Sequence, residues 1–332
     1  MRTVFLILLI FINANIFAQQ YPTNIPVHDP VIIKQDSMYY IFCTGRGISV
    51  WSSTNMKEWK REKPVFDTLP WAVQAVKGFT NHIWAPDISF YNGLYYLYYS
   101  VSAFGKNTSC IGVATNKTLH LSSPDFKWTD HGKVIQSYPG KTNWNAIDPN
   151  IIADKKGNAW MTFGSFWDGL KQVRLKKDRL NIDGDSINPP TIASRKTAAS
   201  SENPPSVDDN PKDAGGNAIE APFIFYKNGY YYLFASIDYC CKGIKSTYKM
   251  IIGRSKKMNG PFIDKNGTDM AKGGGTILLQ GDKNWYGVGH NAVASFNSVD
   301  YLVFHGYDAN DYGKSKLRIE KLQWENGWPL VL

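Results

Sequence analysis

Long apolar runs, cysteines and clustered basic charge are all scarce in this chain of 332 residues. Beyond the N-terminal stretch, no segment reaches the roughly 20 apolar residues that a membrane-spanning helix needs. The formal charge is +9, but Lys and Arg occur only in short groups, which disfavours a nucleic-acid or anionic-membrane partner. No segment shows the periodicity of an amphipathic helix of three turns, so the sequence indicates an all-β protein.

The four cysteines are Cys43, Cys110, Cys240 and Cys241. None has the C-x-x-C spacing of a zinc site, so a structural metal cluster of that kind is not expected. Four cysteines allow three complete pairings, and an exported protein could form any of them. A vicinal ring between Cys240 and Cys241 would be strained, and buried free thiols are the alternative.

The first 18 residues have the pattern of a secretory signal peptide. Met1-Arg2 is a short basic start, residues 4–12 are apolar, and the segment ends at the small residue Ala18. We therefore expect export to the periplasm or the cell exterior, with residues 19–332 forming a single domain. An uncleaved N-terminal anchor is the alternative.

A five-fold repeat predicts the fold. The units open at His28-Asp29-Pro30, Trp84-Ala85-Pro86, Ile147-Asp148-Pro149, Glu220-Ala221-Pro222 and, more weakly, Gly289-His290-Asn291. Each opening begins an apolar hairpin, and Asn-Gly turns close two of them. The four prolines are 56, 63 and 73 residues apart, and four-stranded repeats of this length indicate a five-bladed β-propeller. A β-sandwich or jelly roll is the alternative. Outer strands are expected near Trp59, Trp128 and Pro261-Phe262.

The repeat also predicts where acidic side chains meet. The first strand of each blade lies nearest the axis of a propeller, so Asp29, Asp148 and Glu220 should converge in one funnel, with His290 nearby. Burying acids without partners is costly, so a purely structural protein has little reason to gather them there. Paired carboxylates are what glycoside hydrolysis requires, one to protonate the leaving oxygen and one to activate water or attack.

These motifs resemble the arabinanases of glycoside hydrolase family 43, in the family's order, from about His28 to Trp324. The resemblance implies a five-bladed propeller that hydrolyses α-1,5-L-arabinofuranosidic linkages in arabinan with inversion of configuration. It also implies endo action, which means cleavage at internal linkages of the polysaccharide. It implies Asp29 as general base, Glu220 as general acid, and Asp148 as the residue that orients Glu220 and raises its pKa. An exo-acting arabinanase or arabinofuranosidase, and a non-catalytic carbohydrate-binding propeller, are the alternatives.

The resemblance further implies a calcium ion with His290 as its protein ligand, no organic cofactor, and a monomer. Calcium prefers oxygen ligands, so a lone histidine would be an unusual choice. The residues expected to contact sugar, each of which could instead pack in the core, are Trp84, Phe104, Asn145, Ser165 and Trp167. Asp168 stands where the family usually has glycine. The polar segment 194–217 is either a disordered loop or a wall of the cleft.

Overall fold

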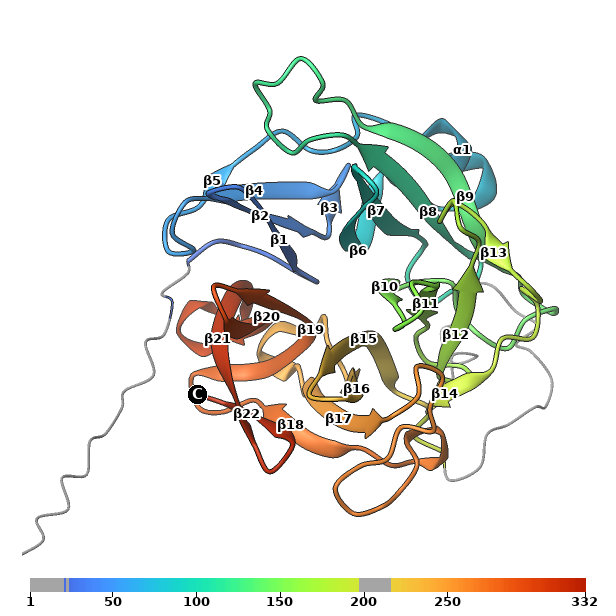
Figure 1. Cartoon of the computed structure of the whole chain (residues 1–332), viewed down its shortest axis with the longest axis vertical. Helices are drawn as coiled ribbons and strands as arrows, with labels where there is room; N and C mark the ends of the chain where they lie inside the picture. The colour runs from blue at the N-terminus through green and yellow to red at the C-terminus, as the bar shows by residue number, and fades with distance from the viewer. Residues whose placement is uncertain (1–20, 22–23, 197–215) are drawn as a thin grey trace, which may run out of the picture.

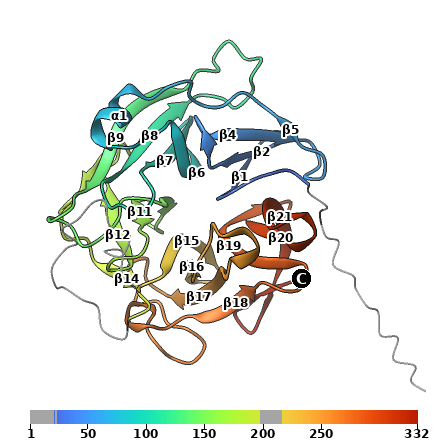
Figure 2. The same cartoon turned by 180° about the vertical axis from the view of Figure 1, so that it is seen from behind.

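A computed structural model describes residue 21 and residues 24–196 and 216–332. Five β-sheets form a ring around a central axis (Figure 1), and the view from behind shows the same ring (Figure 2). The predicted five-bladed propeller is therefore confirmed. The expected signal peptide and most of the 194–217 segment lie outside the described residues. Within the described ranges, no helix is both long and apolar enough to cross a bilayer.

Each blade is an antiparallel sheet of strands that follow one another along the chain, except that residues 45–46, which lie between two strands of blade one, pair with blade two. Blade one contains β1 (Val31–Gln35), β2 (Met38–Cys43), β4 (Ser49–Ser53) and β5 (Lys60–Arg61). Blade two contains β3 (Gly45–Arg46), β6 (His82–Tyr91), β7 (Leu94–Val101), β8 (Ser109–Asn116) and β9 (Thr129–Ser137). Blade three contains β10 (Asn150–Ala153), β11 (Ala159–Phe163), β12 (Leu170–Leu175), β13 (Ile182–Asp183) and β14 (Thr191–Ala193).

Blades four and five have the same plan. Blade four contains β15 (Ile219–Lys227), β16 (Tyr230–Ile237), β17 (Lys249–Ser255) and β18 (Thr276–Gln280). Blade five contains β19 (Trp285–Phe296), β20 (Val299–Asp308), β21 (Lys314–Glu325) and β22 (Trp328–Val331). The helical segments described are α1 (Pro70–Ala75) and the 3₁₀ turns η2 (Gly243–Lys245), η3 (Met270–Lys272) and η4 (Ala309–Asp311).

The chain bends sharply where it enters each blade at the hub. The entry residues Asp29, Ala85, Asp148, Ala221 and His290 all have φ between 41° and 57°. This left-handed conformation is unfavourable for residues other than glycine and persists only where the surrounding structure holds it. The repeated proline-containing motif thus marks a repeated backbone bend.

The amide of each entry residue donates to a side chain near the hub. The acceptors are His305 Nδ1 for Asp29 at 3.1 Å, Thr44 Oγ1 for Ala85 at 2.8 Å, Ser100 Oγ for Asp148 at 2.9 Å, Asp148 Oδ2 for Ala221 at 3.2 Å, and Ser236 Oγ for His290 at 2.8 Å. Four of these acceptors, His305, Ser100, Ser236 and Thr44, lie on the strand or segment opposite the residue that precedes the entry residue of their own blade. The residue at the equivalent place in blade three is Gly164, whose amide donates to Ile147 O. Glycine has no side chain to accept, so the Asp148 carboxylate takes that place.

The hydrophobic core lies between neighbouring blades. Separate clusters of buried side chains join blades one and two, two and three, three and four, four and five, and five and one. Two polar contacts repeat beside the hub. Asp87 accepts the Ile151 amide at 2.7 Å, and Asn150, one blade further on, accepts the Ile224 amide at 2.8 Å.

The predicted outer strands are only partly correct. β5 begins beside Trp59 and β9 beside Trp128, as expected, but the fourth strand of blade four is β18. Phe262 is fully buried in the cluster between blades three and four, and Ile263 forms only isolated bridges to Arg254 and Asp269. The Pro261-Phe262 segment therefore packs into the core instead of forming the outer strand.

Candidate active site

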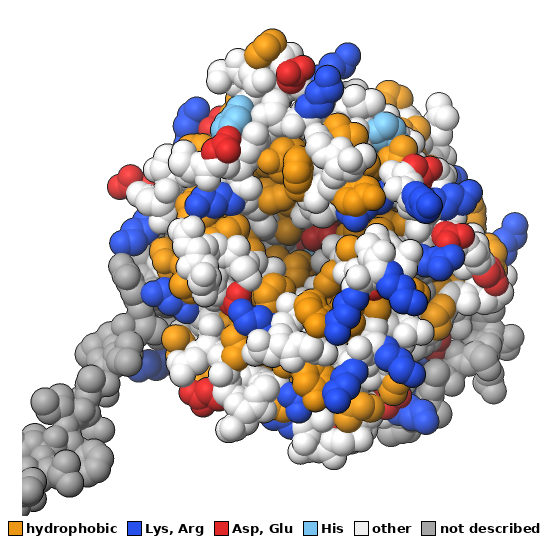
Figure 3. Space-filling view, in the orientation of Figure 1, with side chains coloured by type: hydrophobic (Ala, Val, Ile, Leu, Met, Phe, Trp, Pro, Cys, Tyr) orange, Lys and Arg blue, Asp and Glu red, His pale blue; other side chains and the backbone are white. Residues whose placement is uncertain are grey.

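The three predicted carboxylates gather around the hub. Asp29 and Asp148 are entry residues, and Glu220 directly precedes the entry residue of blade four. Asp148 Oδ2 accepts the amide of Ala221, which places this carboxylate beside the backbone of Glu220. Figure 3 shows the face hollowed at its centre, where acidic side chains lie among hydrophobic ones. The repeat thus brings together acids far apart in sequence.

Asp29 is surrounded by hydrogen-bond donors. Its Oδ1 lies 2.7 Å from Nδ1 of His28 and 3.0 Å from Nδ1 of His290, and its Oδ2 accepts the Thr44 hydroxyl at 2.5 Å. Burial alone would raise the pKa of Asp29, but the two imidazoles outweigh it and hold that pKa well below its usual 3.8. Asp29 is therefore ionised near neutral pH, as a general base must be.

Asp148 has the opposite electrostatic environment. Burial raises its pKa well above 3.8, and the charges of Glu220 and Asp29 add to this effect against that of His290. Glu220 is half-buried and held at both oxygens, since Oε2 accepts the Ser165 hydroxyl at 2.8 Å and Oε1 accepts the Tyr248 hydroxyl at 2.7 Å. The site thus contains an aspartate with a lowered pKa, an aspartate with a raised pKa, and a firmly oriented glutamate.

His290 lies between these acids. Burial would lower its pKa, but Asp29, Asp148 and Glu220 together raise that pKa to about 9. Its Nδ1 faces Asp29, which leaves Nε2 as the nitrogen available to an ion. A cation would bind at Nε2 by displacing the proton that the three acids favour on this imidazole, and the same acids would then balance the charge of the ion. Calcium would need mostly oxygen ligands, which water would have to supply. The residues present therefore fit an ion held by His290 in a water-rich shell.

The five residues expected to contact sugar differ in exposure. Ser165 donates to Glu220, so it lies in the site. Trp84 is half-buried at the entry to blade two, where its Nε1 donates to His82 Nδ1 at 3.1 Å. Phe104 is 78 % exposed on the loop after β7, whereas Trp167 is only 8 % exposed. Asn145 is buried, and its Oδ1 has no hydrogen-bond partner among the described residues.

Asp168, beside Trp167, takes part in a buried ion pair. Its Oδ2 lies 2.7 Å from Nζ of Lys171 and accepts the Thr191 hydroxyl at 2.9 Å, and both charged side chains are buried. Removing one partner of such a pair would leave an uncompensated buried charge. Asp168 therefore links Lys171 on β12 to Thr191 on β14. Aspartate at the position where glycine was expected thus stabilises blade three.

Several site residues were not predicted from the sequence. Tyr248 holds Glu220, while His305 and Tyr307 join His28, which opens the first repeat, in a group of rings next to Asp29. His305 pairs with Gly289 across the hairpin of blade five, so the hairpin register was the signal that could have found it. Cys240 and Cys241 form a vicinal disulfide, and Cys43 and Cys110 are buried free thiols.

A propeller with differently tuned carboxylates in one hollow is the layout of a glycoside hydrolase that works by acid–base catalysis. The profile described as Glycosyl hydrolases family 43 matches residues 22–329, and the chain belongs to this family. The resemblance seen in the sequence is thereby confirmed.

Individual relatives and a solved structure agree with this assignment. The chain is 48 % identical to the extracellular exo-α-(1→5)-L-arabinofuranosidase ArbA of Cellvibrio japonicus, covering 93 % of this chain and 87 % of that protein. It is 43 % identical to the extracellular endo-α-(1→5)-L-arabinanase 1 of Bacillus subtilis, covering 92 % and 88 %. The structure of a Cellvibrio cellulosa α-L-arabinanase complexed with arabinohexaose superposes with a TM-score of 0.87 at 47 % identity, covering 93 % of this chain and 96 % of that one.

Proposed function

We propose that this protein hydrolyses α-1,5-L-arabinofuranosidic linkages in arabinan with inversion of configuration. The observation that carries the proposal is the contrast between Asp29, held ionised by two imidazoles, and Glu220, oriented by two hydroxyl donors in the same hollow. The relatives named as arabinan-cleaving enzymes supply the substrate class. Because those relatives are named extracellular, the proposal includes export.

The residues would act in one concerted displacement. Asp29 accepts a proton from a water molecule, which attacks the anomeric carbon from the face opposite the leaving group. Glu220 donates its proton to the departing glycosidic oxygen. Asp148 would orient Glu220 by accepting the amide of the next residue, Ala221, which fixes the backbone beside Glu220. Among the predicted sugar contacts, Ser165 would fix the carboxyl rotamer of Glu220.

We also propose that His290 holds a calcium ion. Nε2 would be the protein ligand, with water completing the shell, and the nearby carboxylates would compensate its charge. Such an ion would supply a fixed positive charge at the hub. The proton transfers would be carried by Asp29 and Glu220 themselves.

The mode of cleavage has two candidates. Endo action is the expectation from sequence, and the Bacillus relative carries that name at 43 % identity. Exo action is favoured by the higher identity, 48 %, to the Cellvibrio relative. Both use the same carboxylates and differ in whether one end of the cleft is closed.

Product analysis of purified protein on linear arabinan tests the proposal. Early mixed oligomers mean endo action, and steady release of one small product means exo action. Proton NMR during the first turnovers should show the inverted anomer appearing first. Release of the retained anomer first would overturn the roles of Asp29 and Glu220, and sugar binding without turnover would identify a non-catalytic propeller.

A further inference from the structure

We propose that His28 and Tyr307 are positioning residues for Asp29, and that the disulfide-closed loop around Cys241 keeps both in place. This inference rests on the proposed role of Asp29 as the general base. The repeat places His28 beside Asp29 in sequence, but Tyr307 and Cys241 come from blades five and four. Their contacts with His28 are contributed by tertiary structure.

A continuous chain of hydrogen bonds leads from the loop to the base. The Cys241 amide donates to the Tyr307 hydroxyl oxygen at 2.7 Å, and that hydroxyl lies 2.8 Å from Nε2 of His28. Nδ1 of His28 lies 2.7 Å from Oδ1 of Asp29. With Nδ1–H donating to Asp29, Nε2 can accept the Tyr307 O–H, so each group in the chain has a donor and an acceptor.

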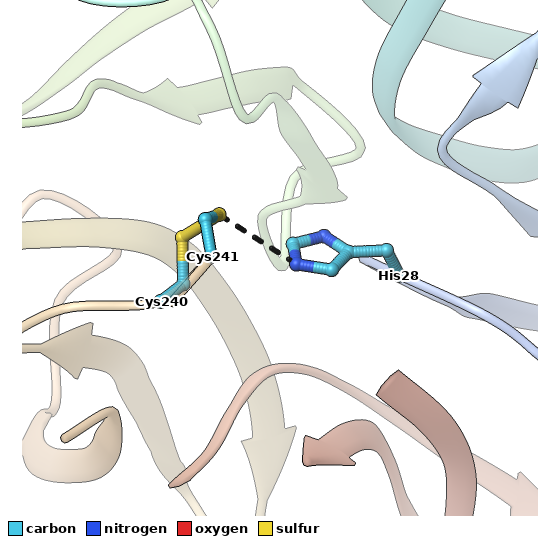
Figure 4. Close-up of side chains that lie close together, drawn as sticks. All are labelled: His28, Cys240 and Cys241. Atoms are coloured by element: carbon cyan, nitrogen blue, oxygen red, sulfur yellow. Dashed lines mark hydrogen bonds between the residues drawn. A yellow bond between two sulfur atoms is a disulfide. The ribbon is translucent and has the colours of Figure 1, made fainter. Parts of the chain in front are cut away.

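The imidazole of His28 has two further contacts, one with a ring face and one at Nε2. It stacks on His305, with ring centroids 3.9 Å apart and planes inclined by 27°. Sγ of Cys241 lies 3.7 Å from Nε2, and Figure 4 shows the disulfide directed at the ring. Because both sulfurs are in the disulfide, they offer no thiolate, so His28, Cys240 and Cys241 do not form a metal site. The contacts leave the ring few alternative orientations.

The loop that carries the disulfide is braced by its own bonds. The amide of Thr247 donates to Tyr239 O at 3.0 Å, and the amide of Lys242 donates to Ser246 Oγ at 3.1 Å. Cys241 itself is exposed, so a dithiol can reach it. Two electrons and two protons from the dithiol would convert the disulfide into two thiols, while the dithiol closes into its own disulfide. Separated thiols would release the loop from His28.

Tyr307→Phe tests the hydrogen-bond chain, because it keeps the buried ring and removes the hydroxyl. We expect kcat to fall about three- to tenfold with KM within about twofold, since the base loses orientation while sugar contacts stay. Tyr226→Phe is the matched control, because Tyr226 lies at the far end of β15, and it should leave kcat unchanged. Equal kcat for Tyr307→Phe and the parent would overturn the role of Tyr307.

Reduction by dithiothreitol tests the loop without any substitution. Reduction should produce two new thiols per chain and lower kcat about as much as Tyr307→Phe does, with the melting temperature unchanged. Reoxidation should restore the rate. A variant carrying both Cys240→Ser and Cys241→Ser should have the lower kcat and no response to the dithiol. Unchanged kcat after full reduction would overturn the role of the disulfide.

Asp29→Asn, measured in parallel, separates this inference from the proposed function. If Asp29→Asn keeps full turnover, the assignment of the general base fails, and the positioning role fails with it. If Asp29→Asn is inactive while Tyr307→Phe and the reduced protein keep their rates, only the positioning role fails.

Discussion

Asp29 and Asp148 occupy the same position in two repeats, share a left-handed backbone and are both buried, yet their pKa values move in opposite directions. The difference comes from their neighbours. Asp29 faces the imidazoles of His28 and His290, whereas Asp148 is strongly affected by burial and by the charge of Glu220. A repeat can therefore deliver identical side chains to one hub, and the unique residues around each then separate their roles.

Glu220→Gln tests the general acid. The amide keeps the shape of the side chain and can still contact Ser165 and Tyr248, but it has no proton to give to a leaving group. We expect kcat on linear arabinan to fall by about 10²–10⁴, with oligosaccharide affinity within a few-fold of the parent. Steady-state kinetics and calorimetric titration measure the two effects.

Glu325→Gln is the control for Glu220→Gln. Glu325 is exposed at the end of β21, so its substitution should leave both kcat and affinity unchanged. Full turnover by Glu220→Gln would contradict the assignment of the acid.

At the scale of elements, first strands are held to one another by buried polar contacts as well as by core packing. Asp87 on β6 accepts the amide of Ile151 on β10, and Asn150 repeats this contact toward β15. The two positions are equivalent in the repeat, but one is ionisable and the other is not. The contact between blades two and three therefore contains a titratable group, whereas the contact between blades three and four does not.

Asp87→Asn should reduce the pH dependence of stability. Burial raises the pKa of Asp87 from 3.8 to about 7, so between these values the folded protein holds a proton that the unfolded chain has lost. The free energy of unfolding should then fall as pH rises from about 4 to 7, by at most about 4 kcal/mol, and level off above. Asparagine still accepts the Ile151 amide but cannot ionise.

Urea denaturation at pH 4.5, 6 and 8 measures this difference. Asp125→Asn, at an exposed aspartate, is the control and should follow the parent at every pH. Parallel stability curves for Asp87→Asn and the parent would show that Asp87 is ionised in the folded state throughout this range.

At the scale of the whole molecule, the ring is closed by packing more than by a shared sheet. Blades one and five come from opposite ends of the described chain, and the backbone contacts between them include the bridge of Pro26 with Lys316. A hydrophobic cluster joins the two blades, and the Asp29 amide donates to His305 across the same junction. An ion at His290 would add a further link between these blades at the hub.

Removing divalent ions should therefore lower the melting temperature. Calcium at about 100 times its Kd would stabilise the protein by about 2.7 kcal/mol, which corresponds to roughly 5 °C for a chain of this size. Differential scanning calorimetry with and without EDTA measures the shift, and added calcium should reverse it. His290→Ala should melt at the same temperature with or without EDTA; a chelator effect that persists in His290→Ala would place the ion elsewhere.

The sequence predicted much of the architecture because the information was local and repeated. Proline after each of four entry residues, together with hairpins closed by Asn-Gly turns, indicated the number of blades and hence the convergence of Asp29, Asp148 and Glu220. The outer strand of blade four was missed because Phe262 looks like a strand residue locally but is buried between blades. Outer strands repeat least, so local pattern gave the weakest guidance there.

What the sequence by itself determined was the ring and the acids on its inner edge, because both follow from a periodic pattern along the chain. Only tertiary structure decided how those acids differ, since the imidazoles of His290 and His305 approach Asp29 from blade five and the Tyr248 hydroxyl reaches Glu220 from the position just before β17 of blade four. The same holds for Trp167, which is 8 % exposed and whose carbonyl oxygen accepts the Asn217 side-chain amide at 3.0 Å. The pKa of a side chain depends on distances and burial, and these exist only once the blades have packed together.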